Sequence, residues 1–122
     1  MPILSVDHIQ LSIPPESEMQ ARRFYVDLLG FAEVPKPAAL AARGGLWLEQ
    51  GTVKLHLGIE PDFHPLKKAH PALIVDDLAA CLAPLLHAGC EVDTSQPPLE
   101  GFRRAHLLDP FGNRIELLER IG

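Results

Sequence analysis

The chain has 122 residues, a hydrophobic content of 47% and a formal net charge of −5 at pH 7. This length suits one ordinary domain, and the acidic balance argues against nucleic acid as a partner. No apolar run approaches the roughly 20 residues of a membrane-spanning helix, and the N-terminal MPILSVDH has no signal-peptide pattern. We interpret Cys81 and Cys90 as reduced core residues. We therefore expect a cytoplasmic protein that binds neither nucleic acid nor membranes.

The first half of the chain predicts a strand, a helix and three further strands. Residues 4–13 alternate in polarity as a strand does. Ser17 and Gln20 form a capping-box pattern, apolar residues then recur at helical spacing, and Gly30 is placed to end the helix. The segments that follow are a strand at 31–34 (FAEV), a loop or short helical turn at 35–43, and strands at 46–50 (LWLEQ) and 53–60 (VKLHLGIE).

The second half repeats this order. A strand at 70–75 (HPALIV) leads into a helix that Asp76 or Asp77 can cap and that Gly89 ends. The strands expected after it are 90–92 (CEV), 102–108 (FRRAHLL) and 114–119 (RIELLE), the last two joined by the turn DPFGN. The sequence thus predicts two copies of a strand–helix–three-strand unit, about 1–62 and 68–122, packed about a pseudo-twofold axis.

Four polar residues occupy corresponding positions of the two copies. His8 lies 48 residues before His56, and His70 lies 46 residues before Glu116. Side chains alternate along a strand, and the apolar neighbours of each of these residues must face the helix of their unit. All four polar side chains therefore point to the opposite face. If the first and last strands of each unit are adjacent, the four residues converge.

Imidazole nitrogens and a carboxylate oxygen are suitable ligands for one divalent ion, such as Zn, Fe, Mn, Ni or Co. Two histidines and one carboxylate with open positions also form the donor set of non-haem iron oxygenases. The alternative is a solvated sheet face that carries four ordinary polar residues. His106 could line a cleft at this face of the sheets, and a packed or edge histidine is an equal alternative.

The stretches DHIQLSI, ARRFYVDLLGF, AHPALIVDDL and DPFGNRIELLE resemble the vicinal oxygen chelate superfamily. This superfamily includes glyoxalase I, extradiol dioxygenases, fosfomycin-resistance transferases and bleomycin-binding proteins. The resemblance covers nearly the whole chain and implies a single glyoxalase-like domain at 1–122. It implies an α+β fold in which two tandem βαβββ units form curved mixed sheets around a cleft, commonly in a homodimer. It also implies metal ligation by His8, His70 and Glu116, with His56 at a fourth position that is usually Glu in glyoxalase I.

Together, the site and the resemblance predict a small metal-dependent enzyme that chelates a small-molecule substrate through two adjacent oxygens. The ion would act as a Lewis acid in a lyase or isomerase step through an oxyanion or enediolate. Glu116 and His56 are the candidate catalytic residues, and a His56 that does not bind the ion is suited to acid–base work. The alternatives are a dioxygenase-like oxygenase and a metal-free binding protein of the bleomycin-resistance type, which sequesters a small molecule.

Overall fold

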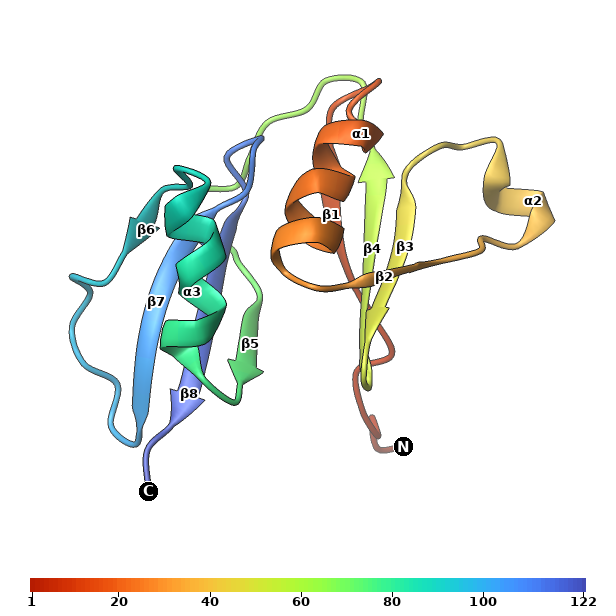
Figure 1. Ribbon diagram of the computed structural model, residues 1–122. Coiled ribbons are helices and arrows are strands. Elements are labelled where there is room, and N and C mark those ends of the chain that lie inside the picture. The colour runs from red at the N-terminus through yellow and green to blue at the C-terminus, as the bar shows by residue number, and fades with distance from the viewer. The chain divides into compact units, whose positions relative to one another are not determined.

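The computed structural model describes residues 1–122, which divide into two compact units, Met1–Phe63 and His64–Gly122. Unit 1 contains, in chain order, β1 (Ile9–Ile13), α1 (Glu18–Ala21), the π-helical segment η1 (Arg22–Leu28), β2 (Ala32–Val34), α2 (Ala38–Ala41), β3 (Leu46–Gln50) and β4 (Val53–Ile59) (Figure 1). Unit 2 contains β5 (Ala72–Val75), α3 (Leu78–His87), β6 (Val92–Asp93), β7 (Phe102–Leu108) and β8 (Arg114–Arg120). None of the helices has the length and apolar character needed to cross a bilayer.

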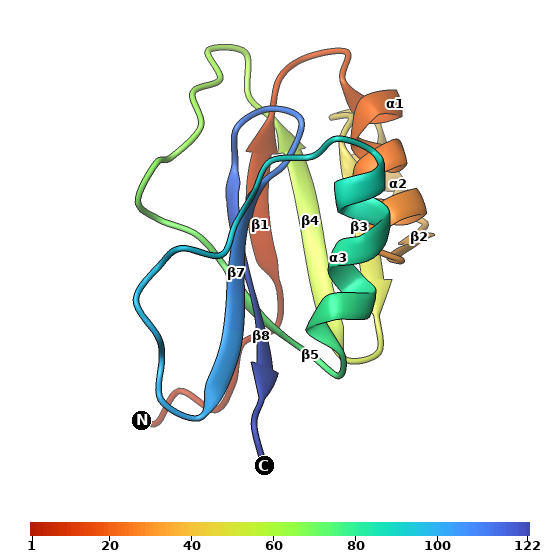
Figure 2. The same ribbon diagram turned by 60° about the vertical axis from the view of Figure 1, so that its left-hand side comes forward.

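Each unit forms one four-stranded mixed sheet, with strand orders β1-β4-β3-β2 and β5-β8-β7-β6. The first strand of each unit pairs in parallel with the last, so that Ile9 lies opposite Leu55 and Ala72 lies opposite Glu116. The remaining pairs are antiparallel, and β7 and β8 form the long hairpin that Figure 2 shows. The α+β prediction with two tandem units is therefore confirmed, as is the adjacency of first and last strands.

The alternation of side chains along β4 and β8 places the core and the polar residues on opposite faces. Leu55 and Leu57 of β4 are buried, whereas Lys54 and His56 point to the other face. In unit 2, α3 lies along the sheet (Figure 1), and its buried leucines belong to the same core as the alternate apolar residues of β7 and β8. Burial of these leucines is the main favourable term in holding each unit together.

The first helix differs from its prediction in two ways. Ser17 occupies the N-cap position, but its hydroxyl donates to the carbonyl of Pro14 instead of capping the helix, so the capping-box prediction is wrong. After Ala21 the helix widens into π geometry, and the Leu29 amide bonds to the Phe24 carbonyl five residues back. The apolar periodicity alone predicts a helix and does not distinguish these two forms.

The helix of unit 2, α3, follows its prediction closely. Asp77 caps it by accepting a hydrogen bond from the amide of Ala80 at 3.0 Å. At the other end, the amides of Gly89 and Cys90 bond to the carbonyls of Leu86 and Leu85, which is the Schellman arrangement. Gly89 has a φ of 81°, a value that glycine adopts without steric cost.

Gly45 marks a close backbone approach in unit 1. Its φ is 81°, and a Cβ at this position would lie 2.1 Å from the carbonyl oxygen of Leu57 on the neighbouring strand. The entry to β3 therefore requires glycine for both conformation and space.

Candidate functional site

Unit 2 holds a compact cluster of three potential metal ligands. The ligand atoms of His70, His106 and Glu116 all lie within 4.8 Å of one another. Glu116 Oε1 is 3.1 Å from His70 Nε2 and 3.5 Å from His106 Nε2. The two imidazole rings meet edge to face, with centroids 5.4 Å apart. His70 and Glu116 thus lie together as predicted, and His106 joins them.

Local backbone contacts fix these three side chains. In the turn DPFGN, Asp109 Oδ1 accepts hydrogen bonds from the amides of Phe111 and Asn113, which sets the register of β7 against β8. That register places His106 directly opposite Glu116. The amide of Glu116 donates to the carbonyl of Pro71. His70 directly precedes Pro71, so this bond brings His70 next to the carboxylate of Glu116.

The hydrogen bonds of His70 suit this residue for metal binding. Its Nδ1 lies 2.7 Å from the carbonyl oxygen of Lys68, which can only accept, so Nδ1 carries the ring proton. In the neutral ring, Nε2 then presents a lone pair toward the carboxylate of Glu116. Two acceptors at 3.1 Å repel one another unless a proton or a cation lies between them. A backbone carbonyl that fixes the tautomer is also the usual second contact of a metal-binding histidine.

Charge in the cluster favours an ionised carboxylate. Burial opposes ionisation of Glu116, but the hydrogen bond from Arg104, and one from His70 when its Nε2 also carries a proton, outweigh burial and hold the pKa of Glu116 below the usual range. Arg104 Nη1 lies 3.1 Å from Glu116 Oε2, and the same guanidinium donates to the carbonyl of Pro97. Burial lowers the pKa of His106, although the carboxylate of Glu116 opposes the shift. An anionic Glu116 and a neutral His106 are the forms that ligate metals, so the donor set fits a divalent ion.

For His106 the sequence leaves two equal interpretations, a residue that lines the cleft and a packed or edge histidine, and the structure places it in the cluster with His70 and Glu116. The signal that could have found it is the hairpin itself. His106 and Glu116 lie at equal distances in sequence from Phe111, the middle of the turn. In an antiparallel hairpin such residues face each other and share one side of the sheet.

Unit 1 places a different group at the corresponding positions. The ring of His56 stacks on His8 and on Trp47, with centroids 4.1 Å apart in both pairs and interplanar angles of 20° and 4°. Burial, followed by the nearby His8, lowers the pKa of His56. The in-plane lone pairs of nearly parallel rings do not converge on one ion at a metal–nitrogen distance of about 2.1 Å. Joint ligation by His8 and His56 therefore requires one ring to turn.

His8 nevertheless resembles His70 in its second contact. Its Nδ1 lies 2.9 Å from a carboxylate oxygen of Asp7, which leaves Nε2 free to bind. The structure thus brings His8 and His56 together, and separately His70 and Glu116. That all four residues serve one ion stays a prediction.

A cavity of about 560 Å³ adjoins the aromatic stack of unit 1. Its charged lining residues are Asp7, Lys36, Arg43, Glu49 and Lys54, and its aromatic lining residues are His8, Trp47 and His56. A volume of this size accommodates a small organic molecule.

The comparisons with known proteins agree with this fold. A family model described as a glyoxalase-like domain matches residues 16–118. The chain belongs to this glyoxalase-like family. Its superfamily is the vicinal oxygen chelate superfamily, as the sequence predicts. A glyoxalase family protein from Bacillus anthracis is 39% identical, with a TM-score of 0.89 and coverage of 99% of this chain and 98% of that one.

Two further solved structures share the fold of this glyoxalase-like protein. The antibiotic binding protein TnmS3 from Streptomyces sp. CB03234 is 27% identical, with a TM-score of 0.73 and 99% of both chains covered. The fosfomycin resistance protein FosX from Listeria monocytogenes shares the fold at 13% identity, with a TM-score of 0.77 and coverage of 98% of this chain and 96% of that one. A search of curated proteins gave no significant match.

Proposed function

We propose that this glyoxalase-like protein is a small metal-dependent enzyme that binds its substrate through two adjacent oxygens. The observation that carries the proposal is the cluster of His70, His106 and Glu116, whose ligand atoms lie within 4.8 Å of one another. These residues would hold one divalent ion, of the group Zn, Ni, Mn, Fe or Co, with His8 and His56 as the further predicted ligands. When bound, the ion would supply a Lewis acid for the substrate oxygens.

The residues of the chain itself would orient the substrate and move its proton. Arg104 holds one oxygen of Glu116 at 3.1 Å, so the carboxylate keeps a fixed orientation. Glu116 is one proposed proton acceptor in a lyase or isomerase reaction, and a His56 that does not bind the ion is the other. His56 suits this role because burial lowers its pKa, which leaves the ring neutral at pH 7.

The test is metal content followed by turnover. Elemental analysis of protein loaded with each candidate ion should give about one ion per chain, and Glu116→Gln should lose most of it. Glu100→Gln, which removes an exposed loop carboxylate, is the matched control and should retain the ion. Turnover is assayed with the hemithioacetal of methylglyoxal and glutathione, and with simple catechols for the oxygenase alternative. Equal metal content in the parent and Glu116→Gln would reject the proposed centre.

A second candidate function is metal-free binding of a small aromatic molecule. The stack of His8, His56 and Trp47 beside the unit 1 cavity favours it, because a planar ligand gains by stacking on such rings. TnmS3, the antibiotic binding protein, is related to this chain at 27% identity. Trp47 is the only tryptophan, so its fluorescence reports ligands at the stack directly. Binding of aromatic compounds without metal, and without turnover when metal is present, would favour this second function.

We also propose that the protein assembles as a homodimer and is located in the cytoplasm. The side chains of Ile3, Leu4 and Val6 are largely exposed in the single chain, and a second copy could cover them. Light scattering at micromolar concentration tests the dimer, and a monomer would count against it.

A further inference from the structure

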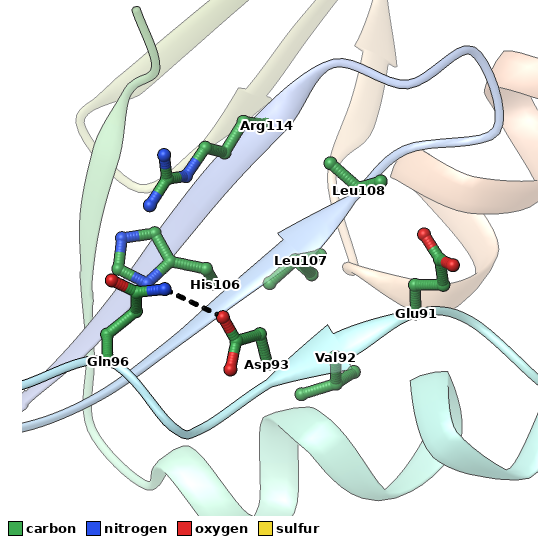
Figure 3. Close-up of a pocket in the computed structure, with 8 residues that line it drawn as sticks. All are labelled: Glu91, Val92, Asp93, Gln96, His106, Leu107, Leu108 and Arg114. Atoms are coloured by element: carbon green, nitrogen blue, oxygen red, sulfur yellow. Dashed lines mark hydrogen bonds between the residues drawn. The ribbon is translucent and has the colours of Figure 1, made fainter. Parts of the chain in front are cut away.

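A second cavity lies in unit 2 next to the histidine–carboxylate cluster. It has a volume of about 510 Å³, within the range of small-molecule sites. Figure 3 shows its polar lining residues, which come from β6, the segments on either side of it, β7 and β8. Those that matter here are Asp93, Gln96, His106 and Arg114.

His106 connects this cavity to the cluster. Only 6% of the residue is exposed, and its Nε2 faces Glu116 at 3.5 Å. Its other nitrogen, Nδ1, is buried and has no hydrogen-bond partner in the protein. A buried polar atom without a partner destabilises the folded state, so native proteins rarely leave one unpaired. Nδ1 is covered in the free protein, and because His106 lines the cavity, a group bound there can reach and satisfy Nδ1 by displacing a neighbouring lining side chain.

Asp93 supplies a hydrogen-bond acceptor on the same side of the cavity. It lies directly across the β6–β7 ladder from His106, so the two side chains leave the same face of the sheet about 5 Å apart at Cβ. Its carboxylate accepts from Gln96 Nε2 and from the amide and hydroxyl of Ser95. These bonds hold the pKa of Asp93 at about 2. A carboxylate has about four acceptor positions, so an ionised Asp93 can accept one more donor.

We propose that this cavity is a substrate subsite for a hydroxyl group, which accepts a hydrogen bond from His106 Nδ1 and donates one to Asp93. The inference rests on the proposed function, since Nδ1 carries the ring proton when Nε2 faces the ion. A hydroxyl is the group that both accepts and donates at one oxygen. The carboxylates of Asp93 and Glu91 outnumber the single cation Arg114 around it, which disfavours an anionic substrate, so the substrate class is an uncharged hydroxy compound.

The experiment compares two probes that differ in one hydrogen-bond donor. Hydroxyacetone and methoxyacetone are titrated into the zinc-loaded, isotope-labelled full chain, and binding is followed by NMR at the His106 ring. Hydroxyacetone should bind at least about tenfold more tightly, because the methyl ether can accept from His106 but cannot donate to Asp93. Asp93→Asn should bring the ratio close to one, while Gln96→Ala, which keeps the carboxylate, should preserve it.

Zinc content is measured in every sample, so the two proposals fail separately. Equal affinities for the two probes in the zinc-loaded parent would overturn the subsite, and this comparison depends on no variant. An unchanged ratio in Asp93→Asn would also overturn it. Discrimination without bound zinc would keep the subsite and reject the metal centre, and the absence of both zinc and discrimination would reject both.

Discussion

The two units build the same sheet and place different chemistry at equivalent positions. In unit 1, His56 has Gln10 on one side and Trp47 on the other, and in unit 2 Glu116 has Ala72 and His106 in the same places. His8 and His70 each precede the first strand of their unit. The positions that hold His, Trp and His in unit 1 thus hold His, His and Glu in unit 2.

Two substitutions account for the difference in chemistry. An indole nitrogen is only a donor, so Trp47 cannot ligate a metal where His106 can. Replacing a carboxylate by the ring of His56 removes negative charge and adds a flat surface, which stacks on both neighbouring rings. One scaffold can therefore carry a donor cluster or an aromatic surface without a change in strand order.

The largest expected effect comes from converting the site positions of unit 1 to those of unit 2. The double variant Trp47→His/His56→Glu gives unit 1 the donor types that surround Glu116, with His8 already present. We expect the metal content to rise by about one ion per chain, measured by equilibrium dialysis with zinc. The single variant His56→Glu, which keeps the indole, is the control. An unchanged stoichiometry would show that side-chain identity alone does not separate the units.

Equivalent core positions should respond alike where the site positions do not. Leu57 and Leu117 occupy corresponding places on β4 and β8, and each is only 2% exposed. Leu57→Ala and Leu117→Ala should each lower the free energy of unfolding by about 2–5 kcal/mol through loss of buried surface and cavity formation. Chemical denaturation measures this loss. A large cost for one leucine and none for the other would break the structural equivalence.

Gly45 offers a smaller test that is specific to unit 1. Its equivalent in unit 2 is Arg104, since Leu46 pairs with Leu57 as Ala105 pairs with Leu117. Gly45→Ala should cost at least about 3 kcal/mol, because strain at positive φ adds to a clash with a backbone carbonyl.

The control for this test is Gly101→Ala. Gly101 has a φ of 85° with open space around it, so the substitution should cost only about 1–2 kcal/mol. Thermal unfolding of both variants decides the matter, and equal costs would mean that the contact with Leu57 is easily relieved.

The smallest effect is a pH dependence. Burial lowers the pKa of both His56 and His106, and in each unit a carboxylate opposes the shift, Asp7 in unit 1 and Glu116 in unit 2. NMR titration of metal-free protein should give midpoints below 6.5 for both rings, and Asp7→Asn should lower that of His56 further. Because the folded-state pKa is depressed, the stability from the neutral rings is complete above pH 6.5 and declines as pH falls below it. A midpoint above 6.5 for His56 would contradict its burial in the stack.

The sequence predicted the fold well because its strongest signals are local. Period-two strands, two apolar helix faces and Gly89 at a helix end each depend on a few neighbouring residues. The π geometry of η1 and the contact between Ser17 and Pro14 were missed, since periodicity does not encode which backbone atoms bond.

The candidate site was predicted in part for a related reason. His70 and Glu116 follow from the repeat, but His106 breaks it, because its equivalent is Trp47. A comparison of the two copies therefore favoured positions that carry a potential metal ligand in both copies, and the position of His106 does not. The stacking of Trp47 depends on side-chain rotation, which strand patterns do not specify.

The parallel pairing of first and last strands affects how each unit is made on the ribosome. β1 hydrogen-bonds only to β4, so the strand that carries Ile9 waits for Leu55 to be synthesised before its ladder can form. At synthesis rates of about 5–20 residues per second, that interval lasts roughly 2–9 s. During it, the apolar side of β1 depends on the nascent helix for cover. Because unit 1 is complete at Phe63, it can close before any of the second sheet exists. Vectorial synthesis thus separates two similar sheets in time and limits the exchange of strands between them.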